Sequence, residues 1–153
     1  MKLIQRFWMY SLVFAAIIML DRITKLWALA NLESPRQLTP FLSLELVFNA
    51  GISWGMFNQS GLLIFSGITL IIVLIIISLS WYAYQRMRHG YIVLGECMVI
   101  AGALSNIIDR FLYQGVIDFI LFSYAQWSFP VFNVADCAIV VGVAYMFIMH
   151  QGD

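Results

Sequence analysis

The chain has 153 residues, of which 63% are hydrophobic and only 10% are charged. This composition lies far outside that of soluble domains, so we expect one integral membrane domain over residues 1–153. Eight basic and eight acidic side chains leave no net charge, which excludes a nucleic-acid-binding protein.

Four apolar stretches approach the roughly 20 residues that a helix needs to cross a bilayer. They cover about residues 7–28, 61–84, 91–108 and 132–149. The first follows Lys2 and Arg6, as in a signal peptide. It ends in DRITK without a small-residue cleavage site, so we interpret it as a retained span. Polar residues end spans one and three and begin span four, so alternating spans would bring these ends to one side of the membrane.

Basic residues divide evenly between the two sides of this arrangement. One side carries Lys2, Arg6, Arg86 and Arg88, and the other carries Arg22, Lys25, Arg36 and Arg110. Arg22, Lys25 and Arg110 have Asp21 or Asp109 within four residues, which indicates a polar cluster rather than a topology signal. We therefore expect both termini to be cytoplasmic.

Two surface segments, residues 31–60 and 111–131, connect the spans. Residues 41–49 (FLSLELVFN) alternate with a period of two, which predicts a strand, and the NAGISWG run after it predicts a turn or a second strand. In the second segment, Tyr124, Trp127 and Phe129 are typical of a membrane-interface belt. Cys97 and Cys137 lack metal-site spacing, and we interpret both as packing residues.

At the end of the first span, Asp21 and Lys25 are four residues apart and therefore share one helix face. One interpretation is an ion pair that anchors the end of the span. The other is that the pair braces a functional site or meets a substrate headgroup.

The sequence GALSNIIDR places Asn106 and Arg110 on one helix face, with Asp109 close by. The planar guanidinium of Arg110 is suited to a carboxylate or a substrate carbonyl. The alternative is that Arg110 snorkels to lipid headgroups with Asp109 as its companion. Gly102 and Ala103 would permit close approach of another helix.

Asp118 in GVIDF and Asp136 in FNVAD border strongly apolar segments, where carboxylates are costly and mark function. Asn133 shares a helix face with Asp136. Each aspartate alone could be a helix cap or an ion-pair partner. Together they could share one proton, so that one activates water while the other donates a proton. This arrangement suits hydrolysis of an amide.

The motifs DRITK, NAGISWG, GALSNIIDR, GVIDF and FNVAD occur in one order over nearly the whole chain. In this the chain closely resembles bacterial lipoprotein signal peptidase, signal peptidase II. The resemblance implies an all-α membrane protein, with four transmembrane helices, a small periplasmic β-cradle and a short surface helix. It also implies an aspartic endopeptidase of the inner membrane, active near the outer leaflet, that cleaves diacylglyceryl-modified prolipoproteins before the lipidated cysteine.

By the same resemblance, Asp118 and Asp136 are the catalytic pair, without a metal or other cofactor. The residues expected to bind substrate or support the pair are Asn49, Asn106, Arg110, Asn133, Asp21 and Lys25. The partners implied are the lipid-modified precursor and membrane lipids, and we expect a monomer. The chain departs from the family at Ser105, where glycine is usual, and at Ser53 and Trp54, which concerns packing and substrate fit.

Two other functions use the same residues. A proton-coupled transporter would relay protons through carboxylates at several depths, but Glu96 alone lies away from the polar cluster. A non-enzymatic assembly subunit would use the cluster to hold helices together. Cleavage of a lipidated precursor, but not of an unlipidated one, would separate the peptidase from both.

Overall fold

A computed structural model of the chain describes residues 3–51 and 59–150. Most of the NAGISWG run, with Ser53 and Trp54, therefore lies outside the described residues. Within them the chain forms four helices and four strands. These are α1 (Leu3–Asn31), β1 (Arg36–Thr39), β2 (Leu42–Asn49), α2 (Gln59–Arg88), α3 (Leu94–Tyr113), β3 (Val116–Tyr124), β4 (Trp127–Ser128) and α4 (Val134–His150).

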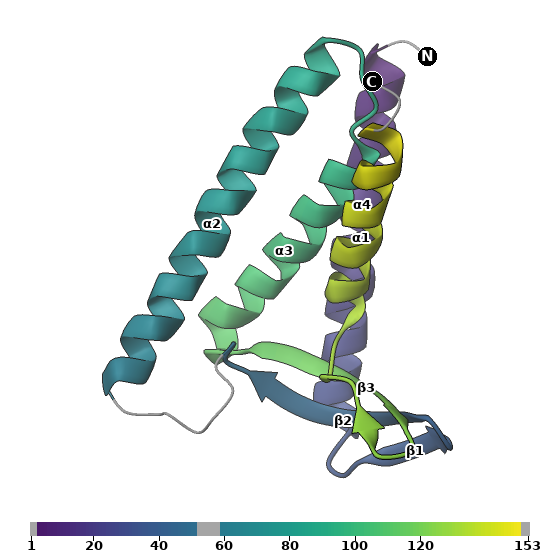
Figure 1. The fold of residues 1–153 in the computed structure, drawn as a ribbon, viewed down its shortest axis with the longest axis vertical. Coiled ribbons are helices and arrows are strands. Elements are labelled where there is room, and N and C mark those ends of the chain that lie inside the picture. The colour runs from purple at the N-terminus through teal and green to yellow at the C-terminus, as the bar shows by residue number, and fades with distance from the viewer. Residues whose placement is uncertain (1–2, 52–58, 151–153) are drawn as a thin grey trace.

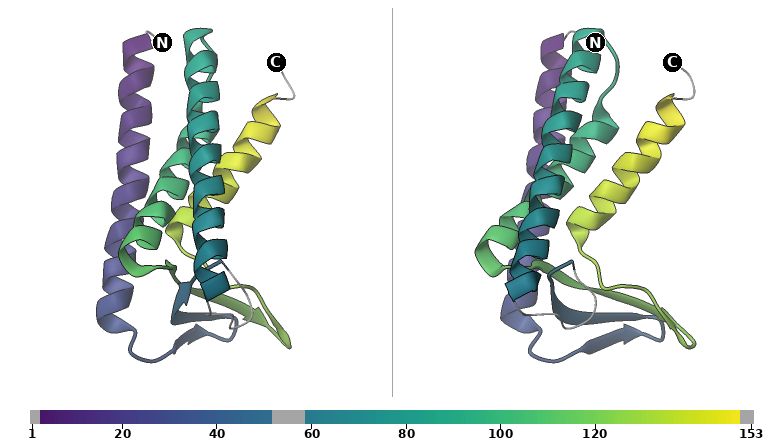
Figure 2. Two further views of the ribbon diagram at one scale, coloured as in Figure 1. Left: turned by 90° about the vertical axis from the view of Figure 1, so that its left-hand side faces the viewer. Right: turned by 60° about the vertical axis from the view of Figure 1, so that its left-hand side comes forward.

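The four helices run alternately toward and away from the sheet, which closes one end of the bundle (Figure 1). Helix α1 begins and α4 ends at the opposite end, so the polar ends predicted for spans one, three and four meet beside the sheet (Figures 1 and 2). Helix α2 stands to one side of the other three. The site therefore has to be sought where α1, α3 and α4 approach the sheet.

The sheet is antiparallel throughout, with its strands in the order β1–β2–β3–β4. Its central pair places Asp118 of β3 opposite Val47 of β2, and Val116 opposite Asn49. Since side chains two residues apart share a face, Asn49 and Asp118 become diagonal neighbours on the same face of the sheet. The register of β2 against β3 thus places the candidate catalytic carboxylate of Asp118 beside the amide of Asn49.

The strand predicted over residues 41–49 is confirmed as β2, and the expected combination of a mostly helical chain with a small sheet is confirmed as well. The second surface segment contains β3 and β4, which complete a four-stranded sheet. Residues 116–119 of β3 are all buried, and a strand buried on both faces shows no alternation that would reveal it. The short surface helix does not occur among residues 3–51 and 59–150.

Helices α1, α2 and α3 all extend beyond the predicted spans, and α2 covers Gln59–Arg88. Helix α1 continues to Asn31 and α3 continues to Tyr113, through polar residues that suggested the ends of spans. In the described part of the chain, α2 over Gly61–Arg88 is the one helix long and apolar enough to cross a membrane by length and composition. Val134–Met149 of α4 forms a shorter apolar helix.

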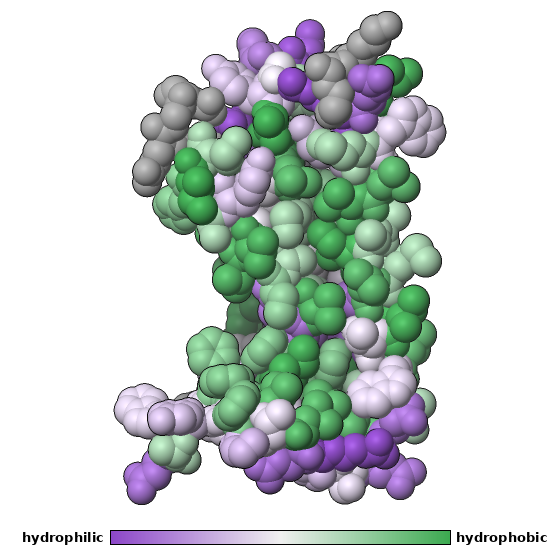
Figure 3. Space-filling model, turned by 90° about the vertical axis from the view of Figure 1, so that its right-hand side faces the viewer, coloured by the Kyte–Doolittle hydropathy of each residue, from purple (hydrophilic) through white to green (hydrophobic). Residues whose placement is uncertain are grey.

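The outer surface of the helices is apolar. Leu12, Leu63, Ile77 and Phe147 are examples of large side chains that are 60% or more exposed. On the face shown in Figure 3, hydrophobic residues fill the middle and hydrophilic residues gather at both ends. Monomeric soluble proteins rarely expose apolar surface on this scale.

Glycines bring α3 and α4 into close contact. A Cβ atom added to Gly102 would lie 2.5 Å from the carbonyl oxygen of Ala135, and one added to Gly95 would lie 2.7 Å from that of Gly142. The expected close approach at Gly102 is therefore confirmed. It sets Asn106 of α3, one turn later, beside the first turn of α4. Cys97 is partly buried, but Cys137 is exposed on α4, so its interpretation as a packing residue is wrong.

Candidate active site

Asp118 and Asp136 meet at Asn133, the residue that precedes α4. The side-chain amide of Asn133 donates to Asp118 Oδ1 at 2.6 Å, and its backbone N–H donates to Asp136 Oδ2 at 3.2 Å. Both aspartates line one pocket of about 290 Å³, formed by α2, α3, α4 and the ends of β2 and β3. Asp118 is buried, with 2% of its surface exposed, and Asp136 is half-buried.

Asn133 and Asp136 cap α4 reciprocally. Asn133 Oδ1 accepts from the backbone N–H of Asp136 at 2.9 Å, while Asp136 Oδ2 accepts from the backbone N–H of Asn133. This has the form of a capping box, in which the two side chains satisfy two otherwise unpaired N–H groups at the start of a helix. Because the cap occupies Asn133 Oδ1, the NH₂ group of Asn133 must point the other way, toward Asp118.

Asn106 is oriented in the same manner by a buried ammonium group. Lys25 Nζ donates to Asn106 Oδ1 at 2.8 Å, and Asn106 Nδ2 donates to Asp136 Oδ1 at 2.8 Å. An ammonium group can only donate hydrogen bonds. Lys25 therefore holds the oxygen of Asn106 and leaves its NH₂ group facing the carboxylate.

A third asparagine follows the same pattern at the end of β2. Asn49 Oδ1 accepts from the backbone N–H of Gly51 at 2.8 Å, and Asn49 Nδ2 donates to Asp118 Oδ2 at 2.9 Å. In all three asparagines the amide oxygen accepts from a group that can only donate. Rotating the amide by half a turn would place its NH₂ group against that donor and its oxygen against the carboxylate. Both oxygens of Asp118 and of Asp136 consequently accept a hydrogen bond.

Lys25 belongs to a buried ionic network behind the pocket. Its Nζ lies 2.7 Å from Asp21 Oδ2 and 2.7 Å from Asp109 Oδ2, in addition to the contact with Asn106, which occupies all three ammonium donors. Lys25 is 1% exposed, and Asp21 and Asp109 are fully buried. Asp109 Oδ1 also accepts a hydrogen bond from Arg22. The predicted ion pair of Asp21 and Lys25 is confirmed, within a larger cluster.

The same network ties the helices to the sheet. Asp21 Oδ1 accepts from the backbone N–H of Ala135 in the first turn of α4, and Asp109 Oδ2 accepts from the backbone N–H of Ile117 in β3. The hydroxyl of Ser105 donates to Asp21 Oδ2 at 2.6 Å. These bonds fix the segments that carry both candidate catalytic aspartates.

Arg110 takes a different position from the one expected for a snorkelling side chain. It is buried, with 7% of its surface exposed, and it lines the pocket. Its guanidinium lies 3.5 Å from Thr69 Oγ1 and 5.1 Å from the centre of the Phe65 ring, both on α2. Among the described residues it forms no ion pair with a carboxylate, and Asp109 is bound by Arg22 and Lys25 instead. Apart from the contact with Thr69, its N–H groups meet no acceptor in the described part of the chain, which leaves them to bind a ligand in the pocket.

The surroundings of Asp118 raise its pKa from 3.8 to about 6. Burial is the largest cause and the charge of Asp136 acts in the same direction, while hydrogen bonds from Asn49 and Asn133 and the charge of Lys25 lower the pKa. Two neighbouring carboxylates with unequal tendencies to ionise can divide the roles of acid and base. In the described part of the chain, no three His, Cys, Asp or Glu side chains converge as metal ligands.

The structure brings all eight candidate residues to one end of the bundle. Sequence reasoning missed Phe65 and Thr69, because nothing in an apolar helix distinguishes the residues that contact an arginine on another helix. The sequence shows Asp109 and Arg22 as charges near the cluster. The contacts of Asp109 with Arg22 and Lys25 depend on packing between α1 and α3, which the sequence does not show.

Comparisons with known proteins agree on one family. The family described as "Signal peptidase (SPase) II" matches residues 13–151. A lipoprotein signal peptidase from Clostridium novyi (strain NT) is 35% identical over 142 residues, 88% of this chain and 93% of that protein. One from Thermodesulfovibrio yellowstonii (strain ATCC 51303 / DSM 11347 / YP87) is 40% identical over 129 residues, 83% of this chain and 84% of that protein.

The fold also has a counterpart among solved structures. A bacterial membrane enzyme determined by the in meso method at 1.9 Å resolution is similar with a TM-score of 0.74 and 26% sequence identity. The match covers 95% of this chain and 94% of that one.

Proposed function

The chain belongs to the signal peptidase II family, and from that membership and the paired carboxylates we propose that it is an aspartic endopeptidase acting on diacylglyceryl-modified prolipoproteins. In this proposal it removes the signal peptide by cleaving before the lipidated cysteine. The family makes the protein a protease that processes lipoproteins. The aspartic mechanism and the position of the cleaved bond are our inference.

The observation that carries the proposal is the opening of Asp118 and Asp136 into one pocket, joined through Asn133. Burial and the mutual repulsion of the two carboxylates favour a pair that holds a single proton. A pair in that state contains one base and one acid within reach of the same bound water. General acid–base catalysis of this kind contributes about 10²- to 10⁴-fold to a rate.

The reaction then proceeds through a tetrahedral diol. The ionised carboxylate takes a proton from water as the water oxygen attacks the scissile carbonyl carbon, and the protonated carboxyl donates its proton to the carbonyl oxygen. In the second step the amide nitrogen takes a proton from the first carboxyl, a diol hydroxyl returns its proton to the second, and the C–N bond breaks. The products are a peptide carboxylic acid and a free amino group on the lipidated cysteine.

The remaining polar residues hold this geometry. The NH₂ groups of Asn49, Asn106 and Asn133 fix the aspartates, and Lys25 with Asp21 fixes the segments behind them. We assign to Arg110 the binding of a substrate backbone carbonyl, since it lines the pocket with N–H donors to spare. No step needs a metal or a covalent enzyme intermediate.

We place the protein in the bacterial inner membrane with four spans and both termini in the cytoplasm. The apolar outer surface and the likeness to a membrane enzyme support the location. Arg6, Arg86 and Arg88 lie at the end away from the sheet, which supports a cytoplasmic position for that end. The site would then lie near the outer leaflet. In this view a monomer meets its lipid-modified substrate from within the bilayer.

The test is cleavage of a lipidated precursor by purified protein in detergent, with an unlipidated precursor as control. We expect cleavage of the lipidated precursor only, and a loss of at least about 100-fold in rate for Asp118→Asn and for Asp136→Asn. The exposed Glu33 provides the matched variant, because Glu33→Gln makes the same carboxylate-to-amide change away from the pocket. Near-normal cleavage by either aspartate variant would overturn the assignment.

A further inference from the structure

A second, larger groove lies at the end of the bundle opposite the site. Its volume is about 440 Å³, and it runs between the first turns of α1, the last turns of α2 and the start of α3. Aromatic side chains of Phe7, Tyr10, Phe14 and Tyr84 line it, and the small side chains of Ser80 and Ala83 leave room between the helices. The proposed reaction uses none of these residues.

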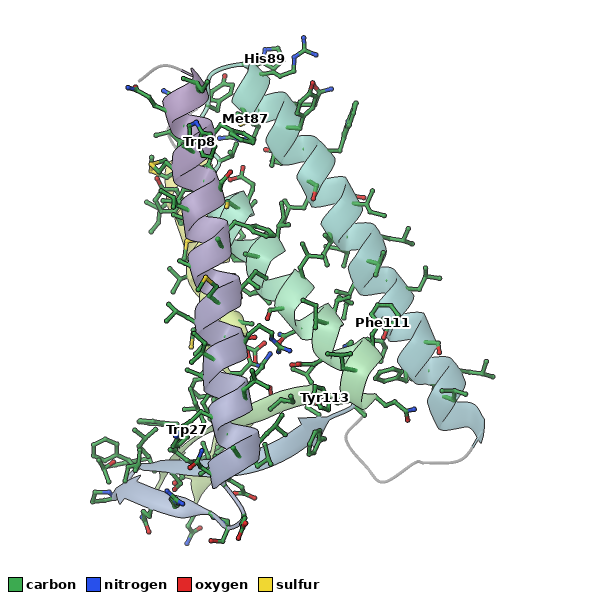
Figure 4. The ribbon with its side chains drawn as sticks, turned by 180° about the vertical axis from the view of Figure 1, so that it is seen from behind. Trp8, Trp27, Met87, His89, Phe111 and Tyr113 are labelled. Carbon is green, nitrogen blue, oxygen red and sulfur yellow. The ribbon has the colours of Figure 1, made fainter. Side chains whose placement is uncertain are left out.

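Two arginines mark the outer end of this groove. Arg6 precedes the lining residue Phe7 and donates a hydrogen bond to the carbonyl of Gly90 in the α2–α3 turn. The guanidinium of Arg88 lies 5.9 Å from the centre of the ring of Tyr84, another lining residue. The lining residue Met87 lies between α1 and α2 at the end where α1 begins (Figure 4).

No acidic side chain of the described chain offsets these two arginines. Glu96 is the one acidic residue at this end within residues 3–51 and 59–150, and it is 1% exposed. Its Oε1 lies 3.1 Å from Nε of Arg86, a third arginine, which also lies 4.8 Å from the centre of the Tyr91 ring. Counted over the described residues alone, the exposed charge at the groove's outer end is therefore positive.

An apolar groove that ends in arginines is complementary to a molecule with a hydrocarbon chain and an anionic head. Guanidinium groups bind phosphate oxygens through paired N–H donors, and basic pockets between helices on the cytoplasmic side hold anionic headgroups. We propose that this groove binds one acyl chain of an anionic phospholipid, with Arg6 and Arg88 holding its phosphate. The inference rests on the membrane location proposed above but not on peptidase activity.

The experiment measures lipid binding to the purified full chain in detergent by native mass spectrometry, using dioleoyl phosphatidylglycerol and dioleoyl phosphatidylcholine. We expect one saturable phosphatidylglycerol site, with a preference over phosphatidylcholine of about fivefold for each arginine that contacts phosphate. Arg6→Gln combined with Arg88→Gln should abolish the preference. Ala83→Trp should fill the groove and remove the bound lipid of either kind.

Matched variants separate these effects from general ones. Arg36→Gln removes an exposed arginine at the sheet end, and Ile77→Trp adds bulk to an exposed position of α2 outside the groove, so both should bind lipid like the unaltered protein. Ser80→Leu provides a smaller obstruction if Ala83→Trp does not fold. Equal binding of the two lipids would overturn the proposal. So would phosphatidylglycerol binding that survives both folded groove-filling variants. Because the readout is binding, a failure of the peptidase proposal would show separately, in the cleavage assay.

Discussion

At the scale of single residues, the site depends on three asparagines whose amides cannot rotate freely. Each gives its oxygen to a donor and its NH₂ group to an aspartate, as the contacts of Asn49, Asn106 and Asn133 demonstrate. Hydrogen bonds donated to a carboxylate favour its ionised form. The asparagines therefore set both the position and the ionisation of the pair.

The pKa of Asp118 gives a test of this view. Asn49→Ala removes a donor to the carboxylate, so we expect the pKa of Asp118 to rise above its value of about 6. The measurement is a ¹³C titration of aspartate carboxyl groups in micelles, with the resonance identified by its absence in Asp118→Asn. Asn31→Ala, at the exposed end of α1, is the matched control. An unchanged or lower pKa would contradict the role of Asn49.

The raised pKa of Asp118 also determines how the stability of the fold changes with pH. Because folding raises the pKa of Asp118 above its ordinary value of 3.8, the protonated form favours the folded state. The contribution of this group to the free energy of unfolding is fully present below about pH 3.8 and is lost as the pH rises through about 6. The burial that raises the pKa of Asp118 thus makes the fold less stable at neutral pH than at low pH.

Lys25 is expected to act on Asp136 through Asn106. Lys25→Met removes the buried ammonium group from Asp21 and Asp109 and leaves them Arg22 as their cation, and removing one partner of a buried ion pair costs about 3–5 kcal/mol. In Asp21→Asn combined with Lys25→Met, we expect thermal unfolding in detergent to show partial recovery of stability. We expect kcat to remain low, because the oxygen of Asn106 then loses the ammonium donor at 2.8 Å and keeps only the longer bond of 3.2 Å from Asn133 Nδ2. If kcat recovered together with stability, the role of Lys25 would be structural only.

At the scale of elements, the close contact of α3 and α4 sets the position of Asp136 relative to Asn106. Gly102→Ala would put a methyl group 2.5 Å from the Ala135 carbonyl, so the helices must separate. Overpacking of this kind costs about 1–3 kcal/mol. We therefore expect a lower unfolding temperature and slower precursor cleavage.

Gly67 of α2 offers the control for that change. A Cβ atom added there meets nothing within 4 Å, so Gly67→Ala should leave cleavage unchanged and add up to about 1 kcal/mol of helix stability. If the alanine at Gly102 were tolerated as well as that at Gly67, the contact between α3 and α4 would not position the site.

The elements differ in how far sequence could predict them. The alternation of apolar and polar residues predicts strand β2. Strand β3 is buried on both faces at residues 116–119, so its sequence shows no such alternation. The end of α3 was placed too early because Asp109 and Arg110 suggested a boundary, whereas partners on other elements keep them inside a continuous helix. The pattern of apolar and polar residues predicts a helix or strand well only where one face of that element is buried and the other is exposed.

The sequence predicts which residues belong to the candidate site better than it predicts their contacts with one another. Polar residues in an apolar chain are few, so Asp118, Asp136 and their neighbours stand out. Which amide faces which carboxylate depends on the register of β2 against β3 and on the cap of α4. Those are long-range contacts that no local spacing encodes.

At the scale of the whole molecule, the two ends of the bundle differ in kind. The sheet end carries the carboxylates and their network, and the other end carries Arg6, Arg88 and the apolar groove. Trp27, Phe111 and Tyr113 lie toward the sheet, whereas Trp8 and His89 lie at the far end (Figure 4). The proposed orientation assigns these ends to opposite leaflets.

Cysteine labelling in intact cells tests that orientation. In a background of Cys97→Ala and Cys137→Ala, we expect Glu33→Cys to react with a membrane-impermeant maleimide from outside. His89→Cys should react only after the inner membrane is permeabilised. Both positions are exposed, so accessibility reports the side of the membrane rather than burial. Labelling of His89→Cys in intact cells would contradict the assignment of the two ends.

The final helix carries one of the two acidic groups, and the other lies on a strand just before it. A nascent chain still emerging from the ribosome, with three helices made, lacks Asp136 and the amide cap that orients its neighbour. Under the proposed mechanism, peptide cleavage therefore begins only after α4 has docked against α3 and α1. A chain with α1, α2 and α3 inserted and α4 not yet docked would lie in the bilayer as an inactive protein.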